Sequence, residues 1–195
     1  MFEGLRREAR DHETIIVITS DHGELLGERH RRGHPGSLDE EVTRIPLFIR
    51  ATDLEPGTNS AIVQLTDVFG YLADKAGLDP ATDSDAVPFG SRREAVIEQR
   101  PDARTPTPPG YPRGDVSALV QWPYKYVEGP QEGAALFDLS LNQEDQVSLL
   151  TRDPTRAAAM SARLRVLSPT SSSSSTGSRP DAAIRERLRA LGYIR

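Results

Sequence analysis

Cysteine is absent from the 195-residue chain. Its absence excludes disulfide bonds, thiolate metal sites and a cysteine nucleophile among these residues. Aromatic residues make up only 6% of the chain, and the hydrophobic content of 36% is low for a compact domain but above that of a disordered one. The length and composition therefore predict one ordinary domain, or one domain with a small appendage.

Long apolar runs and a strong excess of one charge are also missing. The net charge is -5, and no basic face dominates, so a nucleic-acid partner is not expected. No run approaches the roughly 18–20 apolar residues that span a bilayer, so no membrane span is expected. Residues 1–20 lack the pattern of a signal peptide, and a cytoplasmic location is the default expectation unless a further N-terminal segment precedes them.

The first half of the chain has the pattern of strands and helices in an α/β fold. Residues 1–12 have the spacing of a short helix. Residues 14–19 form a continuous apolar and β-branched run, which is typical of a strand covered on both faces in a parallel sheet. The segment "RIPLFIR" (residues 44–50) predicts a second buried strand. Residues 62–78 carry apolar side chains at helical spacing and predict a helix.

The second half has a different character. Short apolar segments predict strands over residues 94–99, 117–121, 124–127 and 134–140. A Pro-rich loop over 101–114 separates the first of these from the rest, and a helix over 153–167 begins with Asp153 as cap and Pro154 at the first helical position. The predicted organisation is an α/β piece over 1–80, a small α+β subdomain over 90–167, a Ser-rich linker over 168–180 and a C-terminal helix over 181–195.

Candidate metal ligands follow the first predicted strand. All four histidines lie between His12 and His34, and Asp21 and His22 come directly after the strand over 14–19. In open α/β sheets, functional groups collect outside the carboxyl ends of the strands. A carboxylate and an imidazole can both contact a divalent cation if Gly23 permits a tight turn, and Ca²⁺, Mg²⁺, Mn²⁺ and Zn²⁺ all stay open as the metal. The alternative from the same residues is a helix N-cap beside a surface histidine.

His34 is the candidate for contact with a substrate. It follows the basic segment 29–32, and guanidinium groups beside an imidazole suit an anionic substrate whose leaving oxygen needs a proton. The alternative is a solvated, charged loop. Glu40, Glu41 and Arg44 precede the second strand and are expected to fix this loop by ion pairing.

These motifs together resemble the C-terminal portion of the sulfatase family, within the alkaline-phosphatase-like superfamily. The likeness is carried by "TIIVITSDHGELLGERHRRGHPGSLDEEVTRIPLFIR" and continues in "QLTDVFGYLADKAGLDP", "WPYKYVEG" and "IRERLRALGYI". Its matching groups are Ser20-Asp21-His22-Gly23, Leu26-Gly27-Glu28, Gly33-His34, Glu40-Glu41 and Arg44-Ile45-Pro46-Leu47. The chain departs from the family pattern at Arg29-His30, where the family often has His-Gly, and at Asp39, where a tyrosine is common.

The resemblance implies a fold and a set of roles. The implied fold is α/β: a partial alkaline-phosphatase-like sheet with flanking helices, then a small antiparallel β-sheet subdomain and a C-terminal helix. Asp21 and His22 fall where the family places two ligands of its divalent cation, usually Ca²⁺. His34 falls where the family has the catalytic and substrate-contacting Lys or His, which touches the sulfate or the leaving-group oxygen.

The family's N-terminal half has no counterpart in these residues. That half supplies an Asp-Asp metal pair and a Cys or Ser that is converted to the formylglycine nucleophile. We therefore expect the C-terminal portion of a metal-dependent sulfuric ester hydrolase, inactive alone, which acts on a sulfate ester only when an N-terminal half completes it. Two alternatives are a phosphodiesterase or phosphonate monoester hydrolase of the same superfamily, and a non-catalytic remnant that acts as a binding module.

Overall fold

The computed structural model describes residues 14–34, 36–78, 85–100, 114–130, 133–141 and 147–168. Several predicted segments lie outside these ranges, wholly or almost wholly: the helix over 1–12, the Pro-rich loop, the Ser-rich linker and the helix over 181–195. Among the described residues, no helix combines the length and the apolar character that crossing a lipid bilayer requires.

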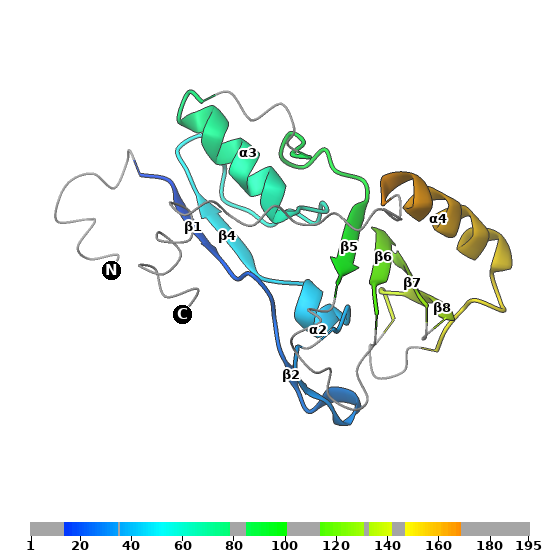
Figure 1. Cartoon of the computed structure of the whole chain (residues 1–195). Helices are drawn as coiled ribbons and strands as arrows, with labels where there is room; N and C mark the ends of the chain where they lie inside the picture. Colours follow the sequence, from blue (N-terminus) through cyan, green and yellow to red (C-terminus); the bar gives the residue numbers. More distant parts are fainter. Residues whose placement is uncertain are drawn as a thin grey trace, which may run out of the picture.

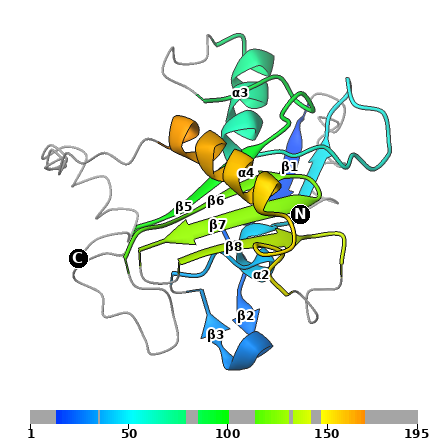
Figure 2. The ribbon, with the colours of Figure 1, turned by 90° about the vertical axis from the view of Figure 1, so that its right-hand side faces the viewer.

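The described residues form three sheets and several helices (Figures 1 and 2). The sheets are an antiparallel pair of β1 and β4, a small hairpin of β2 and β3, and a four-stranded sheet in the order β5-β6-β7-β8. In chain order the elements are β1 (Ile16–Thr19), β2 (Leu25–Leu26), η1 (Glu28–His30), β3 (Arg32–Gly33), α2 (Glu40–Thr43), β4 (Leu47–Arg50), α3 (Leu65–Lys75), β5 (Ala95–Gln99), β6 (Val116–Gln121), β7 (Tyr124–Gly129), β8 (Gly133–Asp138) and α4 (Pro154–Leu167).

The four-stranded sheet confirms the predicted antiparallel subdomain, and it holds the main core. Side chains alternate along each strand, so the sheet has two faces to cover. Helix α4 lies over one face of the sheet (Figure 2). There Leu119, Tyr126 and Leu136 pack against Ala157, Met160 and Leu164 of α4. On the other face Val116 and Ala118 pack against Leu38, which lies two positions before the first residue of α2. Ala118 and Leu119 are both fully buried, so both faces are covered at β6.

Helix α4 begins as the sequence predicts. The side chain of Asp153 accepts a hydrogen bond from the backbone N–H of Arg156 at 3.0 Å, and Pro154 occupies the first turn. Proline is well tolerated there because its missing N–H would have no partner within the helix.

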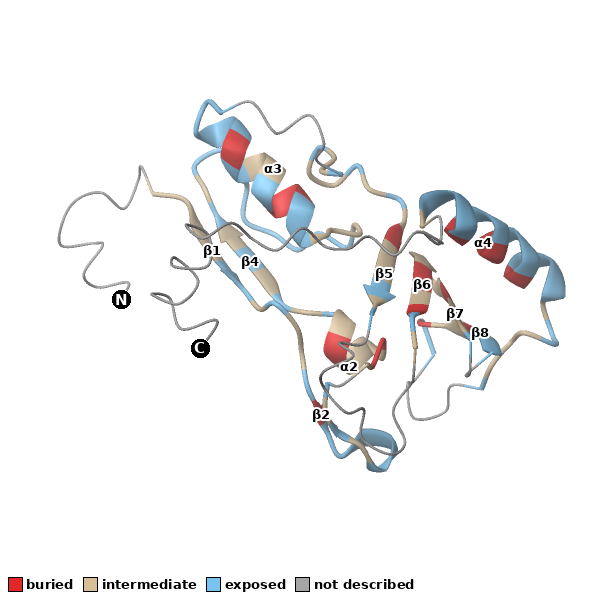
Figure 3. Ribbon diagram, viewed as in Figure 1, coloured by how far each residue is buried: buried red, intermediate tan, exposed pale blue. Residues whose placement is uncertain are grey.

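The pairing of β1 with β4 corrects one expectation. The two strands were predicted as members of a parallel sheet, and they run antiparallel, with Ile16 opposite Arg50 and Thr19 opposite Leu47. A continuous apolar run reports burial but carries no information on the direction of the neighbouring strand, which the 27 residues between Thr19 and Leu47 decide. The strands are also less covered than predicted, since Ile18 is 48% exposed and Phe48 is 65% exposed (Figure 3).

Helix α3 is shorter than the predicted range 62–78 and begins with a reciprocal cap. The Gln64 side chain accepts from the backbone of Asp67, and Asp67 Oδ2 accepts from the backbone N–H of Gln64 at 2.9 Å. Asp67 also receives two hydrogen bonds of 2.6 Å from Arg92 and one of 3.0 Å from the backbone N–H of Val87. This buried carboxylate therefore ties α3 to the segment that leads into β5.

Candidate functional site

Asp21 and His22 lie just past the carboxyl end of β1, as predicted. A set of short polar contacts fixes the backbone there: Ser20 Oγ donates to the carbonyl of His22 at 2.6 Å, and the N–H of His22 donates to Asp21 Oδ1 at 3.0 Å. That backbone N–H holds the pKa of the Asp21 carboxyl below its usual range, with a smaller contribution from the nearby imidazole. Asp21 thus stays ionised at lower pH than an isolated aspartate.

Gly23 is required by close packing of two backbone segments. Its N–H donates to the carbonyl of Val42 at 2.8 Å, and a Cβ at this position would lie 2.0 Å from the carbonyl oxygen of Glu41. The sequence indicated glycine for a tight turn; the structure gives close approach as the reason. This contact holds the strand end carrying His22 directly against α2.

The β2–β3 hairpin brings Glu24 and His34 together. Leu25 pairs with Gly33 and Leu26 with Arg32 in this antiparallel ladder, so one further step places Glu24 opposite His34. His34 Nδ1 lies 2.7 Å from Glu24 Oε1. Because a carboxylate accepts hydrogen bonds, His34 donates through Nδ1 and its Nε2 stays available for another partner.

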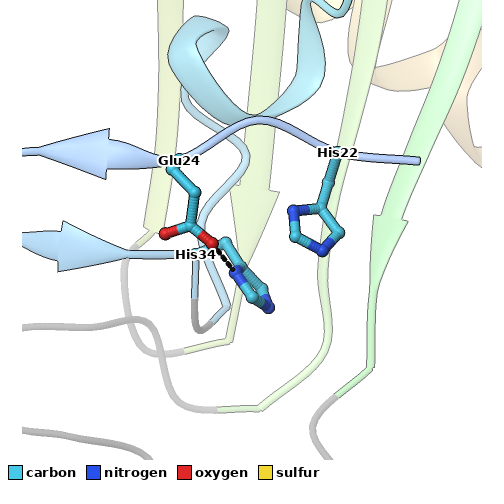
Figure 4. A group of neighbouring side chains, drawn as sticks. All are labelled: His22, Glu24 and His34. Carbon is cyan, nitrogen blue, oxygen red and sulfur yellow. Dashed lines mark hydrogen bonds and ion pairs between the residues drawn. The ribbon is translucent and has the colours of Figure 1, made fainter. Parts of the chain in front are cut away.

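The rings of His22 and His34 also lie side by side, with their centroids 3.9 Å apart (Figure 4). His22, Glu24 and His34 each offer one ligand atom within 4.8 Å of the others, and we refer to them as the triad. Asp21 lies beside the triad, with its Oδ2 3.8 Å from His22 Nε2. The predicted residues Asp21, His22 and His34 are thus brought together at one edge of the fold.

Glu24 is the member of this group that the sequence interpretation missed. The sequence analysis gave Glu24 no role, because the hairpin has strands of only two residues each and produces almost no periodic signal. The sequence carried one signal. Glu24 and His34 lie the same number of positions before and after the segment 27–31, which begins with Gly27 and is otherwise polar.

The arginines near the site are engaged with acidic side chains. Arg29 Nη2 lies 2.7 Å from Glu41 Oε2 and 3.4 Å from Asp39, and Arg31 lies 3.3 Å from Asp39. These pairs confirm that acids before β4 fix the loop by ion pairing. They also mean that Arg29 and Arg31 are not free to meet an anionic substrate in this arrangement. Arg44 instead lies over the Trp122 ring, 5.6 Å from its centroid.

A buried lysine joins the site segment to the four-stranded sheet. Lys125 on β7 is 3% exposed and donates to Glu40 Oε1 at 2.8 Å, to Thr43 Oγ1 at 3.3 Å and to the carbonyl of Leu38. A buried ammonium needs such partners to offset its loss of hydration. Through α2 and the Gly23 contact, this anchor places the end of β1 relative to the larger sheet.

Comparison of the sequence with known proteins finds sulfatases. The model of the family described as Sulfatase matches residues 1–78. Arylsulfatase K of Bos taurus is 25% identical over 165 residues, which cover 78% of this chain and 30% of the relative. The choline-sulfatase of Rhizobium meliloti (strain 1021) is 28% identical over 173 residues, which cover 83% of this chain and 32% of the relative. The chain therefore spans less than a third of the length of these relatives.

Solved structures share the fold. A protein solved in complex with its substrate D-glucosamine-2-N,6-O-disulfate superimposes with a TM-score of 0.74 at 18% identity, over 86% of this chain and 36% of that one. The phosphonate monoester hydrolase of Agrobacterium radiobacter gives a TM-score of 0.66 at 21% identity, over 86% of this chain and 37% of that one. The partial coverage agrees with the C-terminal portion that the motifs predicted. Residues 1–78 therefore match the sulfatase family, and the described part of the chain shares its fold with these solved structures.

Proposed function

We propose that this chain is the C-terminal portion of a sulfatase-family hydrolase and supplies one side of a metal-dependent site for sulfuric ester hydrolysis. The observation that carries the proposal is the convergence of Asp21, His22 and His34 at the carboxyl end of β1, with the first two 3.8 Å apart at their ligand atoms and the two rings 3.9 Å apart. These are the residues to which the family motifs assign metal and substrate contacts.

Asp21 and His22 are the proposed metal ligands. Two bonds to one cation can span the 3.8 Å between Asp21 Oδ2 and His22 Nε2 with little adjustment. A bound divalent cation would supply positive charge against the sulfate oxygens. Ca²⁺ prefers six to eight oxygen ligands, whereas imidazole suits Mn²⁺ or Zn²⁺ better, so Ca²⁺ requires most of its ligands from residues beyond these two.

His34 is the proposed substrate-contacting and catalytic group. Glu24 accepts from its Nδ1 and so sets the ring orientation, which leaves Nε2 directed away from Glu24 (Figure 4). With protons on both ring nitrogens, the imidazolium of His34 can donate the Nε2 proton to a leaving oxygen or a hydrogen bond to a sulfate oxygen, and the ring that has lost this proton keeps its Nδ1–H on Glu24. The nucleophile is proposed to lie in an N-terminal half outside these residues, because the chain has no cysteine, and no serine in a Ser-x-Pro-x-Arg motif before the first strand, that could become formylglycine.

A chimera tests the proposal. This chain replaces the matching third of the Rhizobium choline-sulfatase, and hydrolysis of 4-nitrophenyl sulfate is measured with Ca²⁺, Mg²⁺, Mn²⁺ or Zn²⁺ added. We expect His34→Ala to lower kcat by about 10²–10⁴-fold, as for loss of a general acid. Asp21→Asn and His22→Ala should lower activity and raise the metal concentration at which the remaining activity is half-maximal.

His30→Ala is the matched control, because His30 belongs to the same hairpin but not to the triad. A folded, active chimera that tolerates Asp21→Asn or His34→Ala would refute the assignment. A phosphonate monoester is assayed in parallel. A clear preference of the chimera for this ester over the aryl sulfate would show that the activity is phosphonate monoester hydrolysis and not sulfuric ester hydrolysis.

A further inference from the structure

The loop that carries His34 is bound at both of its ends by one carboxylate. Asp39 Oδ2 lies 3.3 Å from Arg31 Nη1 and accepts a hydrogen bond of 2.5 Å from Ser37 Oγ. These two partners stand three positions before and three positions after His34. Between them the chain turns back, because the N–H of Ser37 donates to the carbonyl of His34 at 3.2 Å. Asp39 thus closes a short loop, residues 31–37, with His34 at its middle.

The Asp39 side chain is not used to begin helix α2. Although Asp39 directly precedes the helix, its carboxylate makes no capping hydrogen bond among the described residues. The backbone carbonyl of Asp39 has that part, because it accepts from the N–H groups of Val42 and Thr43 at 3.0 Å each. The carboxylate instead faces the arginines of the hairpin and Ser37, a buried residue. Its contacts therefore serve the loop around His34 and not the helix.

The β2–β3 hairpin before His34 needs such contacts. Its ladder has only two residue pairs, and a two-stranded hairpin is marginally stable at best by itself. At its tip Arg29 and His30 have positive φ angles of 52° and 59°, which residues other than glycine adopt only when surrounding contacts impose them. Arg29 Nη2 lies 3.4 Å from Asp39 Oδ2 and 2.7 Å from Glu41 Oε2. These ion pairs fix the tip of the hairpin to α2.

Arg29 and Asp39 are two of the positions at which the chain departs from the sulfatase sequence pattern. The structure brings their side chains into contact, so the two departures form a single interaction. Each of these partly buried charges offsets the loss of hydration of the other. The pair is therefore a feature of this chain beyond the residues that the family motif assigns to the site.

We propose that Asp39 is a positioning residue for His34. By binding both ends of the loop over 31–37, its carboxylate fixes the direction of the Cα–Cβ bond of His34. From that direction the ring reaches Glu24 Oε1 at 2.7 Å with Nδ1, and its centroid lies 3.9 Å from that of the His22 ring. Asp39 acts through the loop and not on the substrate. The use of this position in catalysis rests on the proposed function, whereas the position itself rests on these contacts alone.

Nuclear magnetic resonance of the full 195-residue chain, prepared without a histidine tag and with isotope-labelled histidine, tests the proposal. Two-bond proton–nitrogen correlations show which ring nitrogen carries the proton at a pH well above the ordinary histidine pKa of about 6.5. The spectrum of His34→Ala identifies the His34 signals. In the wild type we expect His34 to be protonated at Nδ1, with ring signals displaced by the neighbouring His22 ring. Asp39→Ala should abolish the preference for Nδ1 and move the His34 signals toward those of the exposed His30.

Glu41→Gln is the matched control, because it weakens the contact with Arg29 and leaves Asp39 in place to bind both ends of the loop. It should keep the preference of His34 for Nδ1. Ser37→Ala removes one end of the loop contact and should move the His34 signals part of the way that Asp39→Ala moves them. Circular dichroism checks that each variant is folded, and Ser37→Ala decides the question if Asp39→Ala does not fold.

Unchanged His34 signals in folded Asp39→Ala would overturn the proposal, even if the urea midpoint fell, because Asp39 would then contribute only to stability. Unchanged signals in Ser37→Ala would overturn it where Asp39→Ala does not fold. Equal changes in Asp39→Ala and Glu41→Gln would also overturn it, as would a wild-type His34 without a preference for Nδ1. No turnover is measured, so failure here leaves the hydrolase proposal standing.

Discussion

At the scale of single residues, the site depends on how closely two backbone segments approach. Gly23 lies between the strand end that carries His22 and the α2 segment, and its N–H bonds the carbonyl of Val42. The site therefore has little freedom to shift relative to α2, which Lys125 in turn holds against the four-stranded sheet. A change at Gly23 should disturb both stability and the positions of the metal-facing side chains.

Gly23→Ala is expected to destabilise the protein by about 2–3 kcal/mol, because the new methyl group would lie 2.0 Å from the Glu41 carbonyl oxygen and one backbone must move. The shift of the urea unfolding midpoint measures the effect. Gly57→Ala is the matched control, since a Cβ there meets nothing within 4 Å, and its effect should stay within about 0.5 kcal/mol. Equal midpoints for the two variants would show that the close approach is not a constraint.

Asp21, His22 and His34 could be chosen as candidate site residues from the sequence, because each lies in or beside a recognisable sequence pattern. The apolar run before Asp21 marks the strand end, and the family motif assigns His34. Glu24 could not be placed, because its role depends on the register of a hairpin that only Leu25–Gly33 and Leu26–Arg32 define. Short ladders of this kind depend on tertiary contacts, which composition does not encode.

At the scale of elements, α3 depends on a polar anchor that the sequence analysis did not identify. Asp67 is 2% exposed and accepts hydrogen bonds from Arg92, from Gln64 and from Val87. Burial disfavours the charged carboxylate, but the Arg92 guanidinium and the two backbone N–H groups outweigh it, so the pKa of Asp67 is lowered from its ordinary value. The predicted helix was correct in type, while its anchor joins residues 25 positions apart and left no local pattern.

The lowered pKa of Asp67 predicts a pH-dependent stability. A carboxyl whose pKa is lower in the folded state contributes stability above its unfolded pKa of about 3.9, and that contribution is lost as the pH falls through the folded value. At pH 7, Asp67→Asn should therefore cost about 3–5 kcal/mol, because it leaves Arg92 without its buried partner. Urea midpoints of the wild type and the variant should converge as the pH is lowered from 5 to about 2.

Asp74→Asn is the matched control for this experiment, because Asp74 lies on the same helix with its side chain 77% exposed. It should change the unfolding free energy by no more than about 0.5 kcal/mol at pH 7. A difference in urea midpoint between the wild type and Asp67→Asn that stays constant with pH would contradict the assigned role of the ionised carboxylate.

At the scale of the whole molecule, two apolar surfaces are only partly covered by the described residues. Helix α3 carries the apolar stripe that the sequence predicted, and buried and exposed residues alternate along it (Figure 3): Val68 is 6% exposed, whereas Leu65, Phe69 and Leu72 are 36–57% exposed. Ile18 and Phe48 are exposed on the β1–β4 pair. The sequence pattern correctly reported apolar faces; what covers them could not be read from it. Their exposure agrees with a chain that spans less than a third of its curated relatives.

The exposed β1–β4 and α3 surfaces should make the isolated chain bind the dye ANS or self-associate. Phe48→Ser and Phe69→Ser should each lower ANS fluorescence without lowering the unfolding midpoint. Leu141→Ser is the control, because Leu141 is 55% exposed just after β8, away from these surfaces. A monomeric chain that melts cooperatively and binds no ANS would indicate that nothing is missing from these faces.

We propose that these residues form one side of a sulfatase site whose nucleophile lies elsewhere, and the decisive experiment measures hydrolysis of 4-nitrophenyl sulfate by the isolated chain. The assay compares wild type with Asp21→Asn, each with Ca²⁺, Mg²⁺ or Mn²⁺ and with a chelator. We expect equal rates in all samples, none above the uncatalysed background. Metal-dependent turnover by the wild-type chain that Asp21→Asn abolishes would contradict it, because the chain would then contain a complete active site.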